Sequence, residues 1–248
     1  MKVVATLACR VQSKRLYAKP LQLIDIDNEI TILEYLVGFL KTCKGIDEIV
    51  LAISEGVENH SFEMLAQKMG LRYVIGPELD VQQRLIMAAE KGAGNIVYRV
   101  TTECPFIYMD TFEKILEIHI RNRAALTVIE GLPEGTYYEI ISLSALKAAH
   151  DQGEERHRSE LCTLYMFENP DKFFMQRLRL ESPKLERPDI RLTVDYPEDL
   201  IVVREIYKAL KKSGEYIKIA DIIDYMDAHP KLKELNGWID AGKGRIWD

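Results

Sequence analysis

Residues 3–21 read VVATLACRVQSKRLYAKPL, an apolar run followed at once by a basic loop. The run of residues 3–8 is rich in β-branched and small apolar side chains, which predicts a buried strand. The loop that follows, residues 8–21, has no acidic residue, and its basic residues are Arg10, Lys14, Arg15 and Lys19. In open α/β sheets ligands bind beyond the carboxyl ends of the strands, where loop amides can also face phosphate. The stretch therefore predicts an anion site, with a polyphosphate as its natural ligand; a solvated basic loop is the alternative.

Strand-like and helix-like segments alternate through the rest of the first half, which is the pattern of βαβ units in a mainly parallel sheet. Asp80 is the expected N-cap of one of these helices. The further strands expected are residues 48–53, 71–75, 96–100 and 126–129, and the helices expected are residues 30–40, 61–69, 80–91 and 111–120. This predicts an α/β fold with a mainly parallel sheet flanked by helices.

The alternation loosens in the second half, beginning with the turn GLPEG at residues 131–135. We interpret residues 131–180 approximately as a small insertion on the same sheet, and residues 1–248 as one domain, because no linker, repeat or low-complexity segment interrupts them. The elements expected in this half are helices at residues 143–149, 199–211 and 219–227 and strands at residues 173–180 and 190–194.

Composition narrows the functional classes. The chain has 248 residues, of which 47% are hydrophobic and 29% charged, and no apolar run approaches the roughly 18 residues of a membrane span. The net charge of −6 argues against long-range attraction to nucleic acid or an anionic membrane. The four cysteines form no CxxC pair, which is typical of reduced cytosolic cysteines. We therefore expect a cytoplasmic protein with neither a disulfide framework nor a zinc site.

Six segments together resemble the CMP-sugar synthetases, nucleotidyltransferases of the acylneuraminate and KDO cytidylyltransferase superfamily, and within it the SpsF-like branch of spore coat polysaccharide biosynthesis. The first segment carries the signature R-x-x-S-x-R-L-x-x-K-P-L at residues 10–21. The others are GPELDVQQR (76–84), YRVTTECPFI (98–107), LPEGTYYEIISLSAL (132–146), ELCTLYMFENPDKF (160–173) and RPDIRLTVDYPEDL (187–200). The resemblance implies a Rossmann-like nucleotide-diphospho-sugar transferase fold. It also implies a CTP-dependent cytidylyltransferase that transfers CMP to the hydroxyl of a sugar acid, with release of pyrophosphate, for surface polysaccharide biosynthesis.

The same resemblance implies roles for the basic loop. Arg10, Arg15 and Lys19 match positions that hold the CTP triphosphate and stabilise charge in the transition state, and Ala8 and Ser13 belong to the same nucleotide-binding loop. Attack on the α-phosphorus places negative charge on the equatorial and leaving oxygens, which fixed cations stabilise without reorganisation.

A second nucleotide-binding segment contains Asp80 and Arg84, which match positions lining the nucleotide pocket. The alternative is local: Asp80 caps the helix, and Arg84 one turn later pairs with it.

Two carboxylates are implied as magnesium ligands, Glu103 in T-E-C-P and Asp195 in L-T-V-D-Y-P-E-D. Magnesium prefers carboxylate oxygens together with substrate phosphates. The alternative for Asp195 is to cap the helix that starts at Pro197, a task for which Asp199 competes.

On the acceptor side, the resemblance implies that Glu139 and Arg191 bind the incoming sugar, the arginine facing a carboxylate or phosphate. An internal salt bridge between a glutamate and an arginine is the alternative.

The chain departs from the family pattern at four positions. Tyr17 and Ala18 replace Pro-Gly, Glu103 replaces aspartate, and Leu161 replaces a histidine. Loss of the glycine predicts ordinary backbone dihedral angles at residue 18. His157 and Arg158 are candidates to replace the lost histidine.

Two other functions stay open. The acceptor could be a phosphorylated sugar or metabolite, giving an NDP product, or the chain could be a nucleotide-binding protein with little catalysis. The resemblance also implies a homodimer. Two apparent motifs do not indicate a function. Residues 237–244 nearly match a Walker A loop but lack its Ser/Thr. Asp25-Ile26-Asp27 is better explained as a β-turn.

Overall fold

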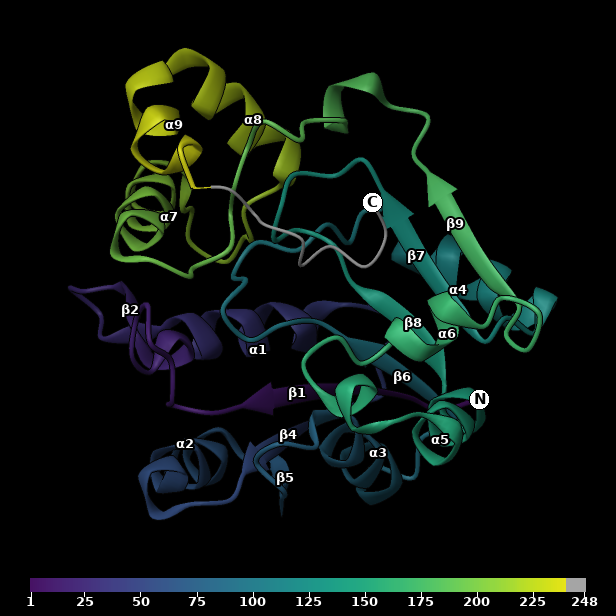
Figure 1. Cartoon of the computed structure of the whole chain (residues 1–248). Coiled ribbons are helices and arrows are strands. Elements are labelled where there is room, and N and C mark those ends of the chain that lie inside the picture. The colour runs from purple at the N-terminus through teal and green to yellow at the C-terminus, as the bar shows by residue number, and fades with distance from the viewer. Residues whose placement is uncertain (240–248) are drawn as a thin grey trace.

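The molecule is built around a mainly parallel β-sheet. The computed structural model describes residues 1–239, and within them the main sheet has seven strands in the order β5-β4-β1-β6-β8-β7-β9 (Figure 1). Its strands are β1 (Val3–Cys9), β4 (Glu48–Ser54), β5 (Arg72–Gly76), β6 (Ile96–Arg99), β7 (Leu126–Glu130), β8 (Glu139–Ser142) and β9 (Met175–Arg179). Only β8 of these runs antiparallel to its neighbours, β6 and β7. The predicted α/β fold class is confirmed.

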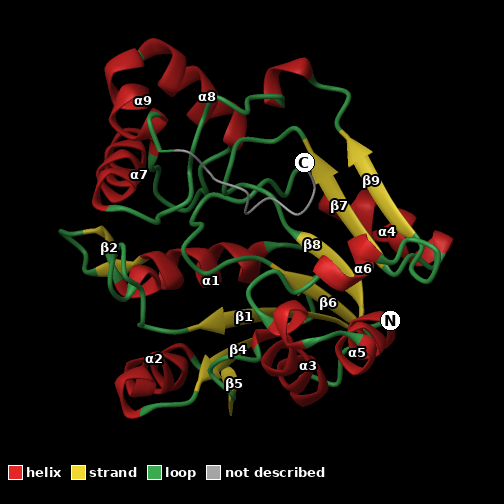
Figure 2. Cartoon of the chain, viewed as in Figure 1, coloured by secondary structure: helices red, strands yellow, loops and turns green. Residues whose placement is uncertain are grey.

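Helices cover both faces of this sheet (Figure 2). Successive residues of β1 point to opposite faces, so that Val3, Ala5 and Leu7 join one buried cluster and Val4 joins the other. The first cluster contains α1 (Ile32–Thr42), α2 (His60–Met69), α4 (Phe112–Asn122), α7 (Pro197–Leu210) and α8 (Ile219–Ala228). The second contains α3 (Val81–Lys91), α5 (Leu143–Gln152) and α6 (Leu164–Glu168). The last helix, α9 (Pro230–Gly237), packs against α7 and α8.

Local sequence explains where the helices begin. Thr31 and Glu34 form a reciprocal capping box at the start of α1, and the Asp80 side chain accepts a hydrogen bond from the Gln83 backbone at the start of α3. The predicted N-cap role of Asp80 is thus confirmed. Asp80 is also expected near the carboxyl ends of the parallel strands, because a crossover helix begins where the preceding strand ends.

A small hairpin, β2 (Leu23–Asp25) and β3 (Ile30–Thr31), follows the basic loop. The Asp25 carboxylate accepts hydrogen bonds from the backbone and side chain of Asn28, which closes the turn between these strands. Asp25 also pairs with Lys211, the residue that follows α7. The interpretation of Asp25-Ile26-Asp27 as a turn is therefore confirmed.

The second half differs from the sequence-based expectation in two places. Residues 190–194 form no strand; their only ladder contact within the described part is an isolated bridge between Arg191 and Glu134. The segment is buried because α7 and α9 pack beside it, and its apolar pattern was therefore misleading. Conversely, β8 was not predicted as a strand. Most of the Walker-like residues 237–244 lie outside the described residues.

None of the helices within residues 1–239 combines the length and apolarity that a membrane span requires.

Candidate active site

The basic loop after β1 is held by backbone hydrogen bonds. The Val11 amide donates to Asn59 Oδ1 (2.9 Å), and the Ala18 amide donates to the Val11 carbonyl (2.8 Å). Ala18 has φ 50° and ψ 45°, the left-handed conformation that favours glycine, so the expectation of ordinary dihedral angles here is wrong. The turn starts a short 3₁₀ helix (Lys19–Leu21), which places the Lys19 side chain under the loop.

Three cations converge on Asp195. Lys19 Nζ lies 2.6 Å and Arg15 Nη2 2.8 Å from Asp195 Oδ1, and Arg191 Nη2 lies 2.7 Å from Asp195 Oδ2. Arg15 also lies over the ring of Tyr196, 5.3 Å from its centroid. About 176 residues separate Lys19 from Asp195 in the sequence, so the fold joins the two predicted halves of the site.

Asp199, and not Asp195, caps α7. Asp199 is fully buried, and its Oδ2 accepts hydrogen bonds from the backbone amides of Asp195 and Tyr196, both at 2.9 Å. Its Oδ1 binds Arg191 Nε (2.9 Å) and Asn236 Nδ2 (2.9 Å). The Asp195 carboxylate is consequently available to cations and ligands.

Glu103 lies beside Asp195. The Glu103 carbonyl accepts a hydrogen bond from the Val194 amide (3.2 Å), which joins the segment after β6 to the residue preceding Asp195. Burial raises the pKa of Glu103; the nearby charge of Lys19 opposes this rise and that of Asp195 adds to it. For Asp195, burial would raise the pKa, but Lys19, Arg15 and Arg191 together hold it below its usual value.

These two carboxylates fit a magnesium ion that also binds nucleotide phosphates. Among residues 1–239, no three or more His, Cys, Asp and Glu side chains gather as a protein-only metal cage. Magnesium is usually held by one or two carboxylates plus phosphate oxygens, and Glu103 and Asp195 supply that donor set. Asp195 would exchange its hydrogen bonds to Arg15 and Lys19 for the metal.

The remaining predicted residues of the loop do not pair with Asp195. Arg10 Nη2 is 3.2 Å from Glu160 Oε2, and both side chains are exposed. The Ala8 carbonyl accepts a hydrogen bond from Thr102 Oγ1 (2.9 Å), which ties the end of β1 to the segment carrying Glu103. Ser13 lies half-buried in the loop.

The segment predicted to line the nucleotide pocket, with Asp80 and Arg84, contacts residues of the second half of the chain. Asp80 Oδ2 binds His150 Nε2 (2.8 Å), and Arg158 Nε lies 3.9 Å from the same oxygen. Arg84 is only 1% exposed, and no described ion pair joins it to Asp80 or to another carboxylate. The proposed local pairing of Asp80 with Arg84 is therefore absent from the described residues.

Glu139 and Arg191 do not pair with one another. Glu139, 1% exposed, binds Arg99 Nη1 (2.6 Å) and Thr163 Oγ1 (2.6 Å). Arg191 binds Glu134, Asp195 and Asp199 instead. Each residue therefore belongs to an internal Glu–Arg salt bridge, as the alternative expected: Glu139 pairs with Arg99, and Arg191 pairs with Glu134.

His157 does not take the place of the family histidine that Leu161 replaces. His157 is buried; its Nε2 contacts Glu168 (2.8 Å) and its Nδ1 accepts a hydrogen bond from the Glu154 amide (2.8 Å). Both partners, Glu154 and Glu168, lie within about a dozen residues of His157 in the sequence, so His157 stabilises the loop after α5. Arg158, half-buried near Asp80, lies closer to the nucleotide segment.

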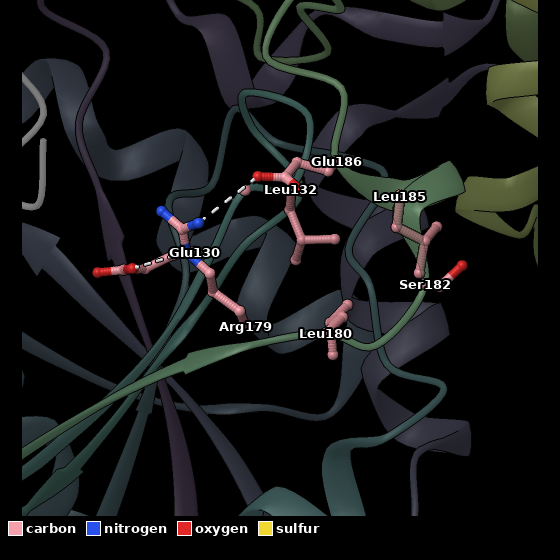
Figure 3. Close-up of a pocket in the computed structure, with 8 residues that line it drawn as sticks. Glu130, Leu132, Arg179, Leu180, Ser182, Leu185 and Glu186 are labelled. Carbon is pink, nitrogen blue, oxygen red and sulfur yellow. Dashed lines mark ion pairs between the residues drawn. The ribbon is translucent and has the colours of Figure 1, made fainter.

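A small cavity elsewhere does not contain the predicted site residues. It has a volume of about 10 Å³ between the ends of β7 and β9, beside the ion pairs of Arg179 with Glu130 and Glu186 (Figure 3). It is large enough for a single water molecule at most.

Sequence reasoning missed Glu160 and Arg99 as site residues, and it named Asp199 only as a helix cap and not as a partner of Arg191. Glu160, Arg99 and Asp199 each fall inside one of the six family-like segments, yet nothing local reveals that they pair with Arg10, Glu139 and Arg191. The sequence signal that could have identified these residues is a charged residue at the end of a strand or the start of a helix.

Comparison with known proteins gives a consistent result. The pattern of a family described as cytidylyltransferase matches residues 4–231. An uncharacterized protein of Methanocaldococcus jannaschii is 30% identical over 239 residues, which cover 95% of each chain. The spore coat polysaccharide biosynthesis protein SpsF of Bacillus subtilis is 25% identical over 240 residues, covering 92% of this chain and 95% of the relative.

Solved structures share the fold. A cytidylyltransferase from Leptospira borgpetersenii superposes with a TM-score of 0.83 at 24% identity, covering 94% of this chain and 96% of that one. A CMP:2-keto-3-deoxy-manno-octonic acid synthetase complexed with CTP gives a TM-score of 0.65 at 14% identity, covering 84% and 99% of the two chains.

Proposed function

Since the chain belongs to the cytidylyltransferase family and is a CTP-dependent nucleotidyltransferase, we propose that it transfers CMP from CTP to the hydroxyl of a sugar acid and releases pyrophosphate. The similarity to SpsF supports a role in surface polysaccharide biosynthesis. The observation that carries the proposal is the convergence of Lys19 and Arg15 on Asp195. It gathers cations for a triphosphate and a carboxylate for magnesium at one point.

In the proposed reaction the acceptor hydroxyl oxygen forms a bond to the α-phosphorus and gives up its proton to solvent. The bond from that phosphorus to the pyrophosphate oxygen breaks, and pyrophosphate leaves. Arg10, Arg15 and Lys19 stabilise the charge on the phosphate oxygens. Ala8 and Ser13 contribute the loop around the nucleotide, and Asp80 and Arg84 line its pocket.

Glu103 and Asp195 are the proposed magnesium ligands. Magnesium supplies charge neutralisation and orientation of the phosphate oxygens when it is bound. Lys19, Arg15 and Arg191 hold the pKa of Asp195 below its usual value, so this carboxylate is ionised at neutral pH and able to bind the metal. Lys19 and Arg15 would then be available to the phosphates.

Glu139 and Arg191 are proposed to act on the acceptor side. Glu139 is held by Arg99 and Thr163, which fixes its position at the start of β8. Arg191 contacts Asp195 through one guanidinium nitrogen and thereby links the acceptor side to the metal site.

We further propose that the enzyme works in the cytoplasm as a homodimer. The four cysteines are free, which suits a reducing compartment. Light scattering after size-exclusion chromatography tests the dimer: a mass of twice 28.6 kDa supports it, and a mass of 28.6 kDa contradicts it.

The reaction is tested by incubating the protein with CTP, magnesium and a panel of keto-sugar acids. We expect pyrophosphate release that depends on one acceptor and a CMP-sugar with a single phosphate by mass spectrometry. A product with two bridging phosphates would instead indicate a phosphorylated acceptor. CTP binding without turnover on any acceptor would favour a nucleotide-binding protein.

A further inference from the structure

Arg84 is a buried cation that forms no ion pair within residues 1–239. It is 1% exposed and is the largest of the fully buried side chains. Its Nε and Nη1 atoms make no hydrogen bond, and no described ion pair neutralises the guanidinium. An arginine stays charged in proteins, and burying a charge without a partner opposes folding. The chain therefore carries a charge that destabilises its own fold.

The surrounding sequence makes room for this side chain. A Cβ atom at Gly76, the last residue of β5, would lie 2.9 Å from Arg84 Cγ and 3.1 Å from Met87 Sδ. Gly76 has no left-handed backbone angle that would require glycine by itself. Its lack of a side chain thus serves to admit the Arg84 stem against the sheet.

The charged end of Arg84 lies at the carboxyl end of β1. The groups that act on it electrostatically are Cys9 and Arg10, where β1 becomes the basic loop, together with Cys162 and Asp80. Burial lowers the pKa of Arg84 and the positive charge of Arg10 lowers it further, whereas Cys9, Cys162 and Asp80 oppose this shift. Two guanidinium groups therefore lie near each other, where an anion between them would turn repulsion into attraction.

We propose that Arg84 and Arg10 form a two-arginine clamp that binds a phosphate group of the nucleotide, Arg84 from the buried side and Arg10 from the exposed side. This inference rests on the proposed nucleotidyltransferase function. Guanidinium groups bind phosphate through paired, charge-assisted hydrogen bonds, which supplies the partners that Nε and Nη1 lack. Glu160, which holds Arg10 in the nucleotide-free protein, is released when the phosphate arrives.

The clamp has a consequence that a structural arginine would not have. Arg84→Met keeps the apolar stem and removes the unpaired charge, so the nucleotide-free protein becomes more stable while phosphate binding weakens. A structural arginine would give the reverse: lower stability and unchanged binding. The two readouts together distinguish these roles.

The test measures melting temperature and ligand affinity for the wild type, Arg84→Met and Arg84→Lys. The ligands are CTP, inorganic pyrophosphate and cytidine, which lacks phosphate. We expect Arg84→Met to raise the melting temperature without ligand by at least about 2 °C. We also expect it to weaken CTP and pyrophosphate binding at least tenfold and to leave cytidine binding unchanged, with Arg84→Lys intermediate. Arg121→Met, on the exposed surface of α4, serves as the control and should change neither quantity.

Failure of Arg84→Met to fold, a lowered melting temperature, or unchanged CTP and pyrophosphate affinity would each overturn the clamp. Turnover by the wild type is scored separately: a wild type that releases no pyrophosphate with any acceptor contradicts the proposed function. A wild type that turns over while Arg84→Met binds CTP equally well contradicts only the clamp.

Discussion

Ala18 keeps a left-handed backbone at the turn that presents Lys19. A residue with a Cβ atom pays about 1–2 kcal/mol for this conformation. The turn is retained because the Ala18 amide bonds to the Val11 carbonyl and the Ala18 carbonyl accepts from the Leu21 amide. The loop therefore stores strain next to the predicted phosphate site.

Replacing Ala18 by glycine should relieve that strain. We expect Ala18→Gly to raise the free energy of unfolding by up to about 1 kcal/mol, measured by urea denaturation. Ala148→Gly, in the middle of α5, is the matched control and should lower it by about 1 kcal/mol. A loss of stability in Ala18→Gly would show that the turn is not strained.

Individual residues show which parts of the site can be predicted from the sequence alone. The basic loop and Asp195 were predictable, because a charge cluster after a first strand and a family-like acidic motif are local features. The convergence of Glu160 on Arg10 was not, since 150 residues separate them and only the folded sheet brings them together. Asp199 shows the same limit: two nearby aspartates compete for one cap, and the geometry of α7 decides between them.

Among the elements, the start of α7 depends on Arg191. This side chain, 6% exposed, connects Asp199 of α7 with Glu134 and Asp195. Removing one member of a buried ion-pair network leaves the other charges without compensation, which typically costs 3–5 kcal/mol.

We therefore expect Arg191→Met to lower the free energy of unfolding by about 3–5 kcal/mol in chemical denaturation. Arg187→Met is the matched control, since Arg187 also bridges two aspartates, Asp189 and Asp227, but these are 42% and 53% exposed. Its loss should cost about 1 kcal/mol or less. Equal losses for the two variants would contradict the role assigned to burial.

His119 joins α4 to β7 and β8 through a buried chain of hydrogen bonds. Gln176 Nε2 donates to Thr127 Oγ1, and Thr127 contacts His119 Nδ1 (2.9 Å). His119 Nε2 contacts Ser142 Oγ (3.3 Å), which donates to the Ala124 carbonyl. The partners fit a neutral imidazole protonated at Nε2.

Burial lowers the pKa of His119 to about 4. Between pH 6.5 and 4 the unfolded chain then binds a proton that the folded protein does not, so stability is lost as the pH falls through this range, by up to about 3 kcal/mol. We expect His119→Asn to reduce the slope of unfolding free energy against pH in this interval. An unchanged slope would show that His119 titrates normally in the folded protein.

Some helices and strands could be predicted from the sequence, and others could not. The strands and helices of the first half have clear periodicity and caps, and α3 begins after Asp80 as expected. The segment of residues 190–194 has the apolar pattern of a strand but is buried by helices, which a one-dimensional pattern cannot distinguish from burial in a sheet. The four-residue β8 is too short to show a period.

At the scale of the whole molecule, a chain with a net charge of −6 concentrates cations at one end of its sheet. Lys19, Arg15 and Arg191 surround the Asp195 carboxylate there, and Glu134 and Asp199 also pair with Arg191. The single domain predicted over residues 1–248 stays a prediction, while the family and the α/β fold are established.

Nucleotide binding should stabilise the whole fold. At 100 times its dissociation constant, CTP with magnesium adds about 2.7 kcal/mol, which corresponds to a rise of roughly 5–10 °C in melting temperature for a chain of this size. ATP, GTP and UTP at the same concentration should give smaller shifts in a thermal-shift assay. A larger shift with another nucleotide would contradict the assignment of CTP.

The central claim is that the basic loop and Asp195 form one site for a magnesium-bound nucleotide. Its most direct test is calorimetric titration of CTP into the wild type and Asp195→Asn, each with and without magnesium. We predict that magnesium tightens CTP binding at least tenfold in the wild type and has no such effect in Asp195→Asn. An equal effect of magnesium on both proteins would contradict the claim.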